Sequence, residues 1–237
     1  MLKKIKQFIK IFLKGYYSKY KKNSYSQCGE DLIVDFLFKF LGILHPTYLD
    51  IGTNDPIILN NTYFFYKAGS TGVCIEPDTN LISYIKSVRK KDKCLNIGVG
   101  TDVGLKDLYI LKSSVLNTFS QDQMKLCIEN GKQSVVETKK INVENINDII
   151  KSNFIETPNF ISLDTEGFDL EIIRSIDFKL YRPQVFCIET LTYSSSREGK
   201  KIIDIIKFME DSGYKVYADT YINTIFVDKD VFDNIIV

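Results

Sequence analysis

The sequence predicts an α/β fold, a doubly wound sheet whose last strand is antiparallel. From residue 47 onward, short apolar runs alternate with longer amphipathic segments, which is typical of parallel strands joined by crossover helices. Near the end of the chain, residues 215–220 and 224–227 are two strand-like runs joined by too few residues for a crossover helix. Two strands joined in this way must be antiparallel. A chain of 237 residues is long enough for one such domain with a small appendage.

The appendage is residues 1–23, and we expect the α/β domain to span residues 24–237. Residues 1–22 contain eight lysines and no acidic residue, and their apolar residues recur at helical spacing. This pattern predicts a basic amphipathic helix. Such a helix can lie on an anionic membrane, or it can pack on its own domain or on a second copy. The pattern favours neither interpretation.

Composition limits the function classes. All 30 acidic residues lie after this helix, which argues against a nucleic-acid-binding body, because such a body needs a basic face. The five cysteines form no C-x-x-C pair and His45 is the one histidine, so we expect reduced thiols and no Cys/His metal site. No apolar stretch is long enough for a membrane span, and no cleavage site follows the first segment. We expect a cytoplasmic protein, with peripheral contact to the inner face of the membrane as an option for residues 1–22.

The first elements of the domain are a helix, three strands and the two helices between those strands. A polar loop at 25–31 leads into the first helix, with Ser26 or Gly29 as its candidate cap; Gln27 and Glu30 equally suit a capping role. In chain order we then expect a strand at 47–52, a helix at about 60–68, a strand at 72–76, a helix at 79–90 and a strand at 93–98.

The second half of the chain continues the alternation of strands and helices, with a loop rich in Ser, Asn and Thr at 113–120 after its first strand. The expected elements are a short strand at 108–111, a helix at about 121–129, a strand at 134–143, a short helix at 145–151, a strand at 160–163, a helix at 169–176, a strand at 184–189 and a helix at about 198–212.

Acidic and small residues follow the predicted strands at their carboxyl ends, where open parallel sheets bind ligands. They are Asp50, Gly52, Asn54 and Asp55 after the first strand, Glu76, Pro77 and Asp78 after the second, Gly98, Val99 and Gly100 after the third, Asp164 and Glu166 after the fourth, and Glu189 after the fifth. We therefore expect a ligand that uses several carboxylates.

The turn after the first strand indicates which ligand this is. Glu76 lies where a carboxylate accepts hydrogen bonds from a ribose diol, a feature shared by dinucleotide and S-adenosylmethionine sites. A dinucleotide pyrophosphate needs the G-x-G-x-x-G turn, and the three positions here are Gly52, Asn54 and Ile57. One glycine of the three remains, which argues against a dinucleotide.

Charge leads to the same choice. Asp50, Asp55 and Asp78 would repel a diphosphate, whereas Asp50 or Asp55 could hold the ammonium group of a methionyl ligand. A sulfonium would also suit an acidic pocket. The residues therefore favour S-adenosylmethionine as the cofactor.

Six motifs in order resemble the FkbM family of S-adenosylmethionine-dependent methyltransferases. They are Ser-Gln-x-Gly-Glu-Asp-Leu (26–32), Asp-Ile-Gly-x-Asn-Asp-Pro (50–56), Asn-Thr-Tyr (61–63), Gly-Val-x-Ile-Glu-Pro (72–77), Asn-Thr-Phe-Ser (117–120) and Leu-Asp-Thr-Glu-Gly (163–167). The resemblance spans about residues 24–228. It implies a class I methyltransferase fold, which is Rossmann-like and has seven strands with the last antiparallel, and O-methylation, often of sugar hydroxyls.

The same resemblance implies roles for individual residues. The methionyl part of the cofactor would lie among Asp50, Gly52, Asn54 and Asp55, the ribose beside Glu76 and Pro77, and the adenine edge beside Gly98 and Val99, with Asn117 as a further cofactor-binding residue. Gly98-Val99-Gly100 offers backbone contacts only.

Methyl transfer to an alcohol needs a base, because the nucleophile loses a proton as the new bond forms. His45 is expected at the opposite end of the sheet, so Asp164 is the first candidate and Glu166 the second. A third option is that Asp164, Glu166 and Glu189 bind Mg²⁺, which would acidify the hydroxyl. We rank metal below direct base catalysis, because the motif has no ligand spacing that demands a metal.

Structural roles compete with these assignments. Asp164 and Glu166 would suit the cap and first turn of the helix at 169–176, and Glu76-Pro77 would suit an ordinary loop. Residues 193–197 are expected to shape an acceptor pocket.

The function we favour is S-adenosylmethionine-dependent O-methylation of a small-molecule or glycan acceptor, namely a carbohydrate or a surface-glycan precursor. The rivals are an NAD-type dinucleotide or nucleotide-sugar enzyme, and a non-catalytic scaffold that docks to a membrane or partner through residues 1–22.

Overall fold

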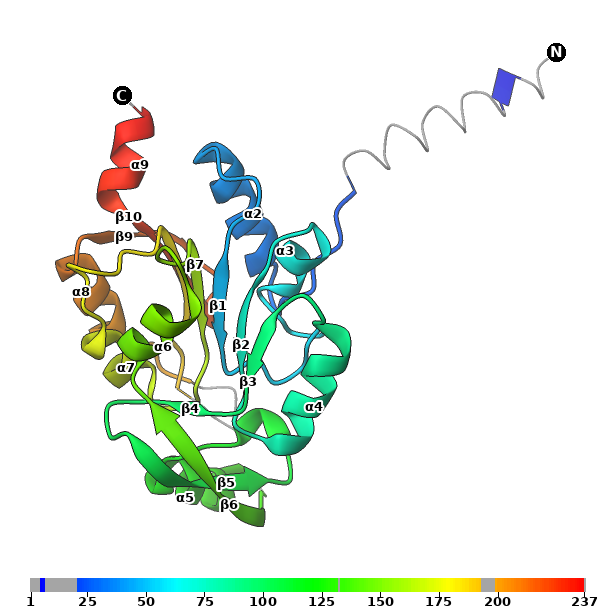
Figure 1. Cartoon of the computed structure of the whole chain (residues 1–237), viewed down its shortest axis with the longest axis vertical. Coiled ribbons are helices and arrows are strands. Elements are labelled where there is room, and N and C mark those ends of the chain that lie inside the picture. The colour runs from blue at the N-terminus through cyan, green and yellow to red at the C-terminus, as the bar shows by residue number, and fades with distance from the viewer. Residues whose placement is uncertain (1–4, 7–20, 132, 193–198, 237) are drawn as a thin grey trace.

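A central seven-stranded sheet organises the computed structural model, which describes residues 5–6, 21–131, 133–192 and 199–236 (Figure 1). The strand order across the sheet is β3-β2-β1-β7-β8-β10-β9. These strands are β1 (Tyr48–Ile51), β2 (Gly72–Ile75), β3 (Lys93–Leu95), β7 (Phe160–Leu163), β8 (Val185–Glu189), β9 (Tyr214–Asp219) and β10 (Asn223–Asp228).

β1 lies in the middle of the sheet and pairs in parallel with β2 on one side and β7 on the other. β7 in turn pairs in parallel with β8, so the carboxyl ends of these four strands meet at one edge. β10 is antiparallel to both of its neighbours, β8 and β9. The predicted doubly wound sheet with an antiparallel last strand is confirmed.

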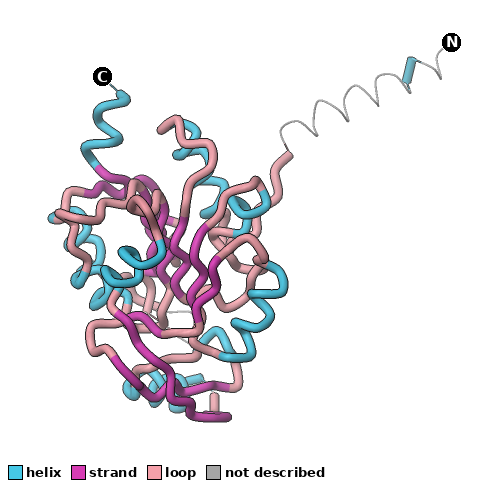
Figure 2. The backbone as a smooth tube through the Cα atoms, viewed as in Figure 1, coloured by secondary structure: helices cyan, strands magenta, loops and turns pink. Residues whose placement is uncertain are grey.

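Helices cover both faces of the sheet (Figure 2). On one face, Leu49 and Ile51 of β1 share a buried cluster with α6 (Ile146–Asn153), α7 (Asp169–Ser175) and α8 (Ile203–Asp211). Tyr48 belongs to the cluster on the other face, because successive strand residues point to opposite sides. That face is covered by α2 (Glu30–Phe40), α3 (Tyr63–Lys67), α4 (Thr79–Val88) and α9 (Lys229–Ile236).

A second sheet of three strands lies beyond the carboxyl ends of the central strands, at the bottom of Figure 1. Its order is β4-β6-β5, and it carries a short helix and α5. The bounds are β4 (Gly98–Val99), β5 (Gly104–Leu111), η1 (Ser114–Leu116), α5 (Gln121–Gly131) and β6 (Val135–Glu144). The longer strand β5 was not expected from sequence, because its first half is polar.

The single strand predicted at 93–98 is wrong in its second half. β3 ends at Leu95, and Gly98 pairs with Val143 of β6 in the second sheet instead. The side chain of Asn96 donates hydrogen bonds to the carbonyls of Glu76 (2.9 Å) and Pro77 (2.8 Å), so the chain leaves the central sheet at this residue.

Two differences concern the last helices. α8 begins at Ile203, later than predicted, because the backbone of residues 200–202 hydrogen-bonds to the segment after β8: Thr192 N donates to Lys200 O and Ile202 N donates to Thr190 O. α9 was not predicted. It begins after Asp228, whose carboxylate accepts hydrogen bonds from the backbone of Asp230 (2.9 Å) and Val231 (3.2 Å).

Most of the predicted N-terminal helix, and residues 193–197 of the expected acceptor pocket, lie outside the described residues. Within the described ranges, every helix is too short or too polar to cross a bilayer.

Candidate active site

A cavity of about 570 Å³ opens at the carboxyl ends of β1, β2, β7 and β8, between the central sheet and the small sheet. Its lining includes ten of the residues that the sequence singles out: Gly52, Asn54, Asp55, Glu76, Pro77, Gly98, Val99, Asn117, Asp164 and Glu166. The fold therefore brings four strand ends and the loop before α5 around one space of a size that suits a small ligand.

Asp50 does not line the cavity. It is buried on the same face of the sheet as Tyr48, where its Oδ2 accepts hydrogen bonds from Thr62 Oγ1 (2.8 Å) and Asn60 Nδ2 (3.1 Å). Burial raises the pKa of this carboxyl. Strand alternation is the reason for this placement, because Asp50 precedes Ile51 and points to the opposite face. Asp50 therefore lies behind the cavity wall.

The turn after β1 brings two backbone segments into close contact. Gly52 has φ +80°, and a Cβ there would lie 1.8 Å from the carbonyl oxygen of Asp164. Asn54 has φ +50°, the left-handed conformation that a side chain disfavours. Asp55 Oδ1 closes the turn by accepting hydrogen bonds from the backbone of Ile57 (2.8 Å) and Ile58 (2.7 Å). Only glycine fits at position 52.

Glu76 is buried at one side of the cavity. Its Oε2 accepts a hydrogen bond from Asn54 N (2.9 Å) and its Oε1 accepts one from Asp78 N (2.8 Å). Burial raises the pKa of Glu76 to about 7, although both hydrogen bonds favour the charged form. Each carboxylate oxygen keeps a further lone pair, so Glu76 can accept two more hydrogen bonds from a diol.

The small sheet supplies the opposite wall. Asn117 Oδ1 accepts a hydrogen bond from Leu111 N (2.9 Å), and its Nδ2 donates to Asp78 Oδ2 (3.4 Å). Lys139 of β6 lies 3.5 Å from the other oxygen of Asp78, which also caps α4. The loop at 113–120 is therefore fastened to the residues after β2, and Asn117 has a structural role besides its place in the lining.

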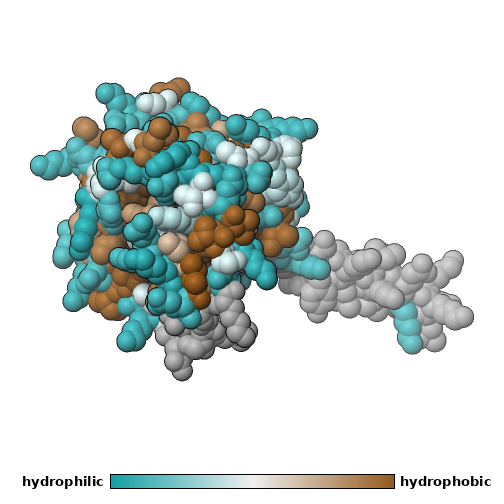
Figure 3. Space-filling model, turned by 90° about the horizontal axis from the view of Figure 1, so that it is seen from below, coloured by the Kyte–Doolittle hydropathy of each residue, from teal (hydrophilic) through white to brown (hydrophobic). Residues whose placement is uncertain are grey.

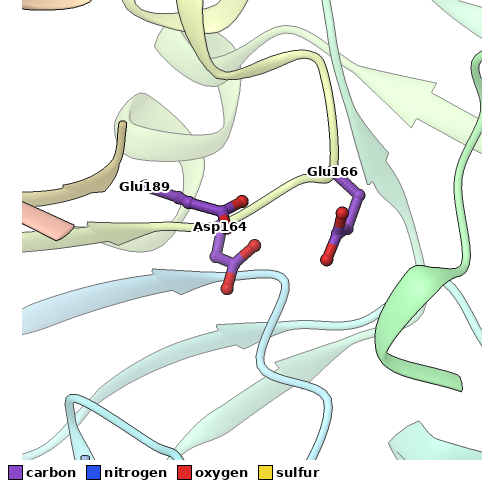
Figure 4. A group of neighbouring side chains, drawn as sticks. All are labelled: Asp164, Glu166 and Glu189. Carbon is purple, nitrogen blue, oxygen red and sulfur yellow. The ribbon is translucent and has the colours of Figure 1, made fainter. Parts of the chain in front are cut away.

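Three carboxyl groups gather at the ends of β7 and β8 (Figure 4). Asp164 directly follows β7, Glu189 is the last residue of the neighbouring parallel strand β8, and Glu166 lies in the turn toward α7 with φ +51°. One oxygen of each lies within 4.8 Å of the others. All three line the cavity.

This crowding changes the protonation of the three groups. Asp164 is exposed to the cavity, yet desolvation by the protein packed around its carboxyl group and the neighbouring Asp169 raise its pKa to about 7, although hydrogen bonding with Glu189 opposes the rise. The pKa values of Glu166 and Glu189 rise further, through burial and the charge of Asp164. These shifts favour the protonated forms of Glu166 and Glu189, and they place the titration of Asp164 near neutral pH.

The charge of the lining limits what can bind. Five acidic residues face the cavity, and none of its described lining residues is Lys, Arg or His. A diphosphate would meet repulsion here, whereas a neutral or cationic ligand would not.

Some lining residues were missed or undervalued by the sequence reasoning. The sequence places Glu189 among the acids at the strand ends but predicts no individual role for it other than metal ligation. Gln27 was read as a cap, yet it lines the cavity. Phe119 belongs to the Asn-Thr-Phe-Ser motif, but the sequence predicts no role for it, because the approach of its ring to Gly98 depends on the tertiary fold.

The amino-acid sequence itself identifies the kind of protein that carries this site. Residues 50–216 match the model of the methyltransferase FkbM domain, which is well over half of the chain. The chain belongs to the FkbM methyltransferase family. The match of this FkbM chain begins at Asp50, so it includes every predicted cofactor-binding residue but not the motif at 26–32.

Solved structures with a similar fold are distant in sequence from this FkbM methyltransferase. A TehB-like SAM-dependent methyltransferase from Corynebacterium glutamicum is 11% identical, with a TM-score of 0.45 and coverage of 93% of this chain and 97% of that chain. An O-methyltransferase from Bacillus cereus in complex with SAH is 11% identical, with a TM-score of 0.42 and coverage of 92% and 87%. Magnesium protoporphyrin IX methyltransferase from Synechocystis with bound SAM is 10% identical, with a TM-score of 0.40 and coverage of 87% and 85%. A comparison with curated proteins finds no significant match.

Proposed function

We propose that this protein is an S-adenosylmethionine-dependent O-methyltransferase that acts on a carbohydrate hydroxyl. The observation that carries the proposal is one cavity with a buried ribose-accepting carboxylate, Glu76, at one side and the titrating Asp164 at a strand end beside it. Family membership supports methyl transfer. The acidic lining supports a donor that carries a sulfonium and an ammonium group.

The donor is proposed to lie along the ends of β1 and β2. The turn at Gly52, Asn54 and Asp55 would hold the methionyl part, Glu76 and Pro77 the ribose, and Gly98, Val99 and Asn117 the adenine. Asp50 supports this arrangement from behind the wall, through Asn60 and Thr62.

The reaction proposed at Asp164 is an in-line displacement. The acceptor oxygen forms a bond to the methyl carbon, the bond from that carbon to sulfur breaks, and the hydroxyl proton passes to the Asp164 carboxylate. S-adenosylhomocysteine leaves as a neutral thioether. A base with a pKa near 7 suits this task at neutral pH, whereas Glu189, whose pKa rises to about 11, can donate a hydrogen bond to the acceptor.

A neutral sugar is the acceptor that the cavity favours, because carboxyl groups in either protonation state bind hydroxyls, whereas the ionised ones repel phosphates. We place catalysis in residues 24–237, and keep residues 1–23 as a separate basic segment for contact with a membrane or a second copy inside the cell. No nucleic-acid partner is proposed.

Calorimetry with S-adenosylhomocysteine tests the donor. We expect binding, and folded protein that gives no heat at millimolar ligand would overturn the assignment; a thermal shift with NAD instead would favour the dinucleotide rival. Labelled S-adenosylmethionine with a panel of free and nucleotide-linked sugars then tests the acceptor. Label transfer to neutral sugars in preference to diphosphate-linked ones is the expected result.

The affinity for S-adenosylhomocysteine should rise with pH through about 7. The raised pKa leaves Glu76 largely neutral below that pH, and ribose hydroxyls donate best to its ionised form, so binding releases a proton. Affinity at pH 6 is expected to be about tenfold weaker than at pH 8. Calorimetry across this range measures the slope.

Two variants test whether Glu76 is the group that causes this pH dependence of the affinity. Glu76→Gln should abolish it, while Glu129→Gln, an exposed glutamate on α5, should keep it. A slope that persists in Glu76→Gln would mean that another group titrates on binding.

Removal of divalent cations should leave methyl transfer unchanged. Direct base catalysis by Asp164 needs no ion, and an ion would have to displace the protons that burial favours on Glu166 and Glu189. The measurement is label transfer to the best acceptor after EDTA treatment and desalting, with and without added Mg²⁺. A rate that is lost with EDTA and restored by Mg²⁺ would instead support Lewis-acid catalysis.

A further inference from the structure

Arg89 is a fully buried arginine directly after α4, and it does not line the cavity. Its Nε donates a hydrogen bond to Asp92 Oδ2 at 2.8 Å, and this ion pair is inaccessible to solvent. The guanidinium also lies over the rings of Tyr48, Tyr63 and Tyr66, with Tyr66 nearest at 4.8 Å from its centroid. Burying a charge in this way is costly unless it is paired and fully hydrogen-bonded.

Every N–H of this guanidinium finds an acceptor. Nη1 donates to the carbonyl of Pro56 (3.1 Å) and to Asn60 Oδ1 (3.2 Å). Nη2 donates to Thr62 Oγ1 (2.8 Å) and to the hydroxyl of Tyr48 (3.1 Å). With the bond to Asp92, these bonds use all five donors that an arginine has.

Three of these acceptors belong to the segment that forms the cavity wall. Asn60, held by Arg89, in turn donates hydrogen bonds from Nδ2 to the carbonyls of Asp55 (3.1 Å) and Thr53 (3.4 Å) and to Asp50 Oδ2 (3.1 Å). Thr62, the other acceptor, donates to the same oxygen of Asp50 (2.8 Å). The backbone of residues 53–56 is therefore held from behind by one guanidinium and one amide.

We propose that Arg89 is a positioning residue for the methionyl half of the donor, acting through Asn60 on the 53–56 segment; this rests on the proposed function. The adenosyl half is proposed to depend on Glu76 and the β3–β4 region, to which Arg89 donates no hydrogen bond. Glu76 meets the 53–56 segment at one bond, from Asn54 N, and is also held by Asp78 N on its other oxygen. Loss of the Arg89 hydrogen bonds should therefore weaken the binding of ligands that carry the amino-acid part and spare the binding of those that lack it.

Arg182 provides a matched control. It too pairs with a carboxylate, Asp228 (2.7 Å), donates to two backbone carbonyls, and lies over a tyrosine ring, that of Tyr214, at 5.0 Å from its centroid. It lies outside the cavity lining. Substitution of either arginine removes the same kinds of bond, but only Arg89 of these two lies beside the 53–56 segment.

The experiment measures the affinity of full-length protein for two probes, S-adenosylhomocysteine and 5′-methylthioadenosine, which lacks the amino-acid part. Arg89→Lys keeps the charge but cannot reach Asp92, Pro56 and Thr62 together. We expect it to weaken S-adenosylhomocysteine by about tenfold or more and methylthioadenosine by less than about threefold. Arg182→Lys should change neither affinity. If Arg89→Lys does not fold, Asn60→Ala is measured in its place and should show the same selectivity.

Two other outcomes are informative in different ways. Wild-type protein that binds neither probe would remove the proposed donor, and the positioning role with it. Wild-type protein that binds both, combined with variants that lose both equally or neither, would overturn the role of Arg89 and leave the proposed function standing.

Discussion

Replacement of Asp164 by Asn is expected to lower kcat by about 10²- to 10⁴-fold, with the affinity for S-adenosylhomocysteine largely retained. The amide keeps the shape of the carboxyl group and one acceptor oxygen, but it cannot take up the acceptor proton. Its loss also relieves repulsion from Asp169 and Asp50, so the melting temperature should not fall. Rate loss in a folded, ligand-binding protein would then report on chemistry alone.

The pH profile gives an independent readout of the same group. In wild-type enzyme the rate should rise with pH through about 7 and then level off, because the base must be ionised and its pKa is about 7. The residual rate of Asp164→Asn should lack that inflection. Label transfer at saturating donor, measured between pH 5.5 and 8.5, is the appropriate assay.

Asp169→Asn is the matched control. Asp169 is buried nearby and accepts hydrogen bonds from the backbone and hydroxyl of Thr165 at 3.0 Å, but it does not line the cavity. An asparagine there can still accept these bonds, so kcat should remain within about tenfold of wild type. Equal losses of kcat in the two variants, or equal losses of rate and cofactor affinity in Asp164→Asn, would assign Asp164 a binding or structural role.

The central sheet could be predicted from sequence because its signals are local. The runs that form β1, β2 and β7 are fully or almost fully apolar and end in Gly, Pro or acidic residues, so their bounds come within about two residues of the structure. The ends of the same strands then give most of the cavity lining, because the topology of a parallel sheet places them together.

What could not be predicted depends on contacts between distant residues. The departure of the chain at Asn96 follows from its bonds to the carbonyls of Glu76 and Pro77, which no periodicity reveals. The hydrogen bonds of the Arg89 guanidinium join residues as far apart as Tyr48 and Asp92, whereas the sequence pattern shows Arg89 only as one more charge in the last turn of the helix predicted at 79–90. Asp50 is a different case, because strand alternation already placed it opposite Ile51, and the family motif outweighed that signal.

The exposure of apolar side chains at the surface is also difficult to predict from sequence. On the face in Figure 3, hydrophilic side chains predominate and apolar ones form separate patches. Ile58 (66% exposed) and Leu59 (57% exposed) are apolar residues of the cavity lining, and a hydropathy pattern would have placed such residues in the core. Their position in a turn closed by Asp55, rather than their hydrophobicity, decides their exposure.

Replacement of Gly52 by Ala is expected to lower the free energy of unfolding by about 3–5 kcal/mol. Two costs add at this position. The backbone has φ +80°, which an alanine adopts only with strain, and the new Cβ would lie 1.8 Å from the carbonyl oxygen of Asp164. A backbone atom cannot rotate away as a flexible side chain would, so the ends of β1 and β7 must separate. Urea unfolding followed by circular dichroism measures the loss.

Gly42→Ala separates these two costs. Gly42 has φ +75°, nearly the same conformation, but a Cβ there would have no neighbour within 4 Å, so we expect only the conformational strain of about 1–2 kcal/mol. The surplus in Gly52→Ala is the part due to the contact with Asp164. Because that contact fixes where the proposed base sits relative to the donor turn, Gly52→Ala should also lose methyl transfer at temperatures where it remains folded, whereas Gly42→Ala should keep it. Equal destabilisation of the two variants, with activity retained in both, would show that the strand ends tolerate separation and that Gly52 serves only the turn.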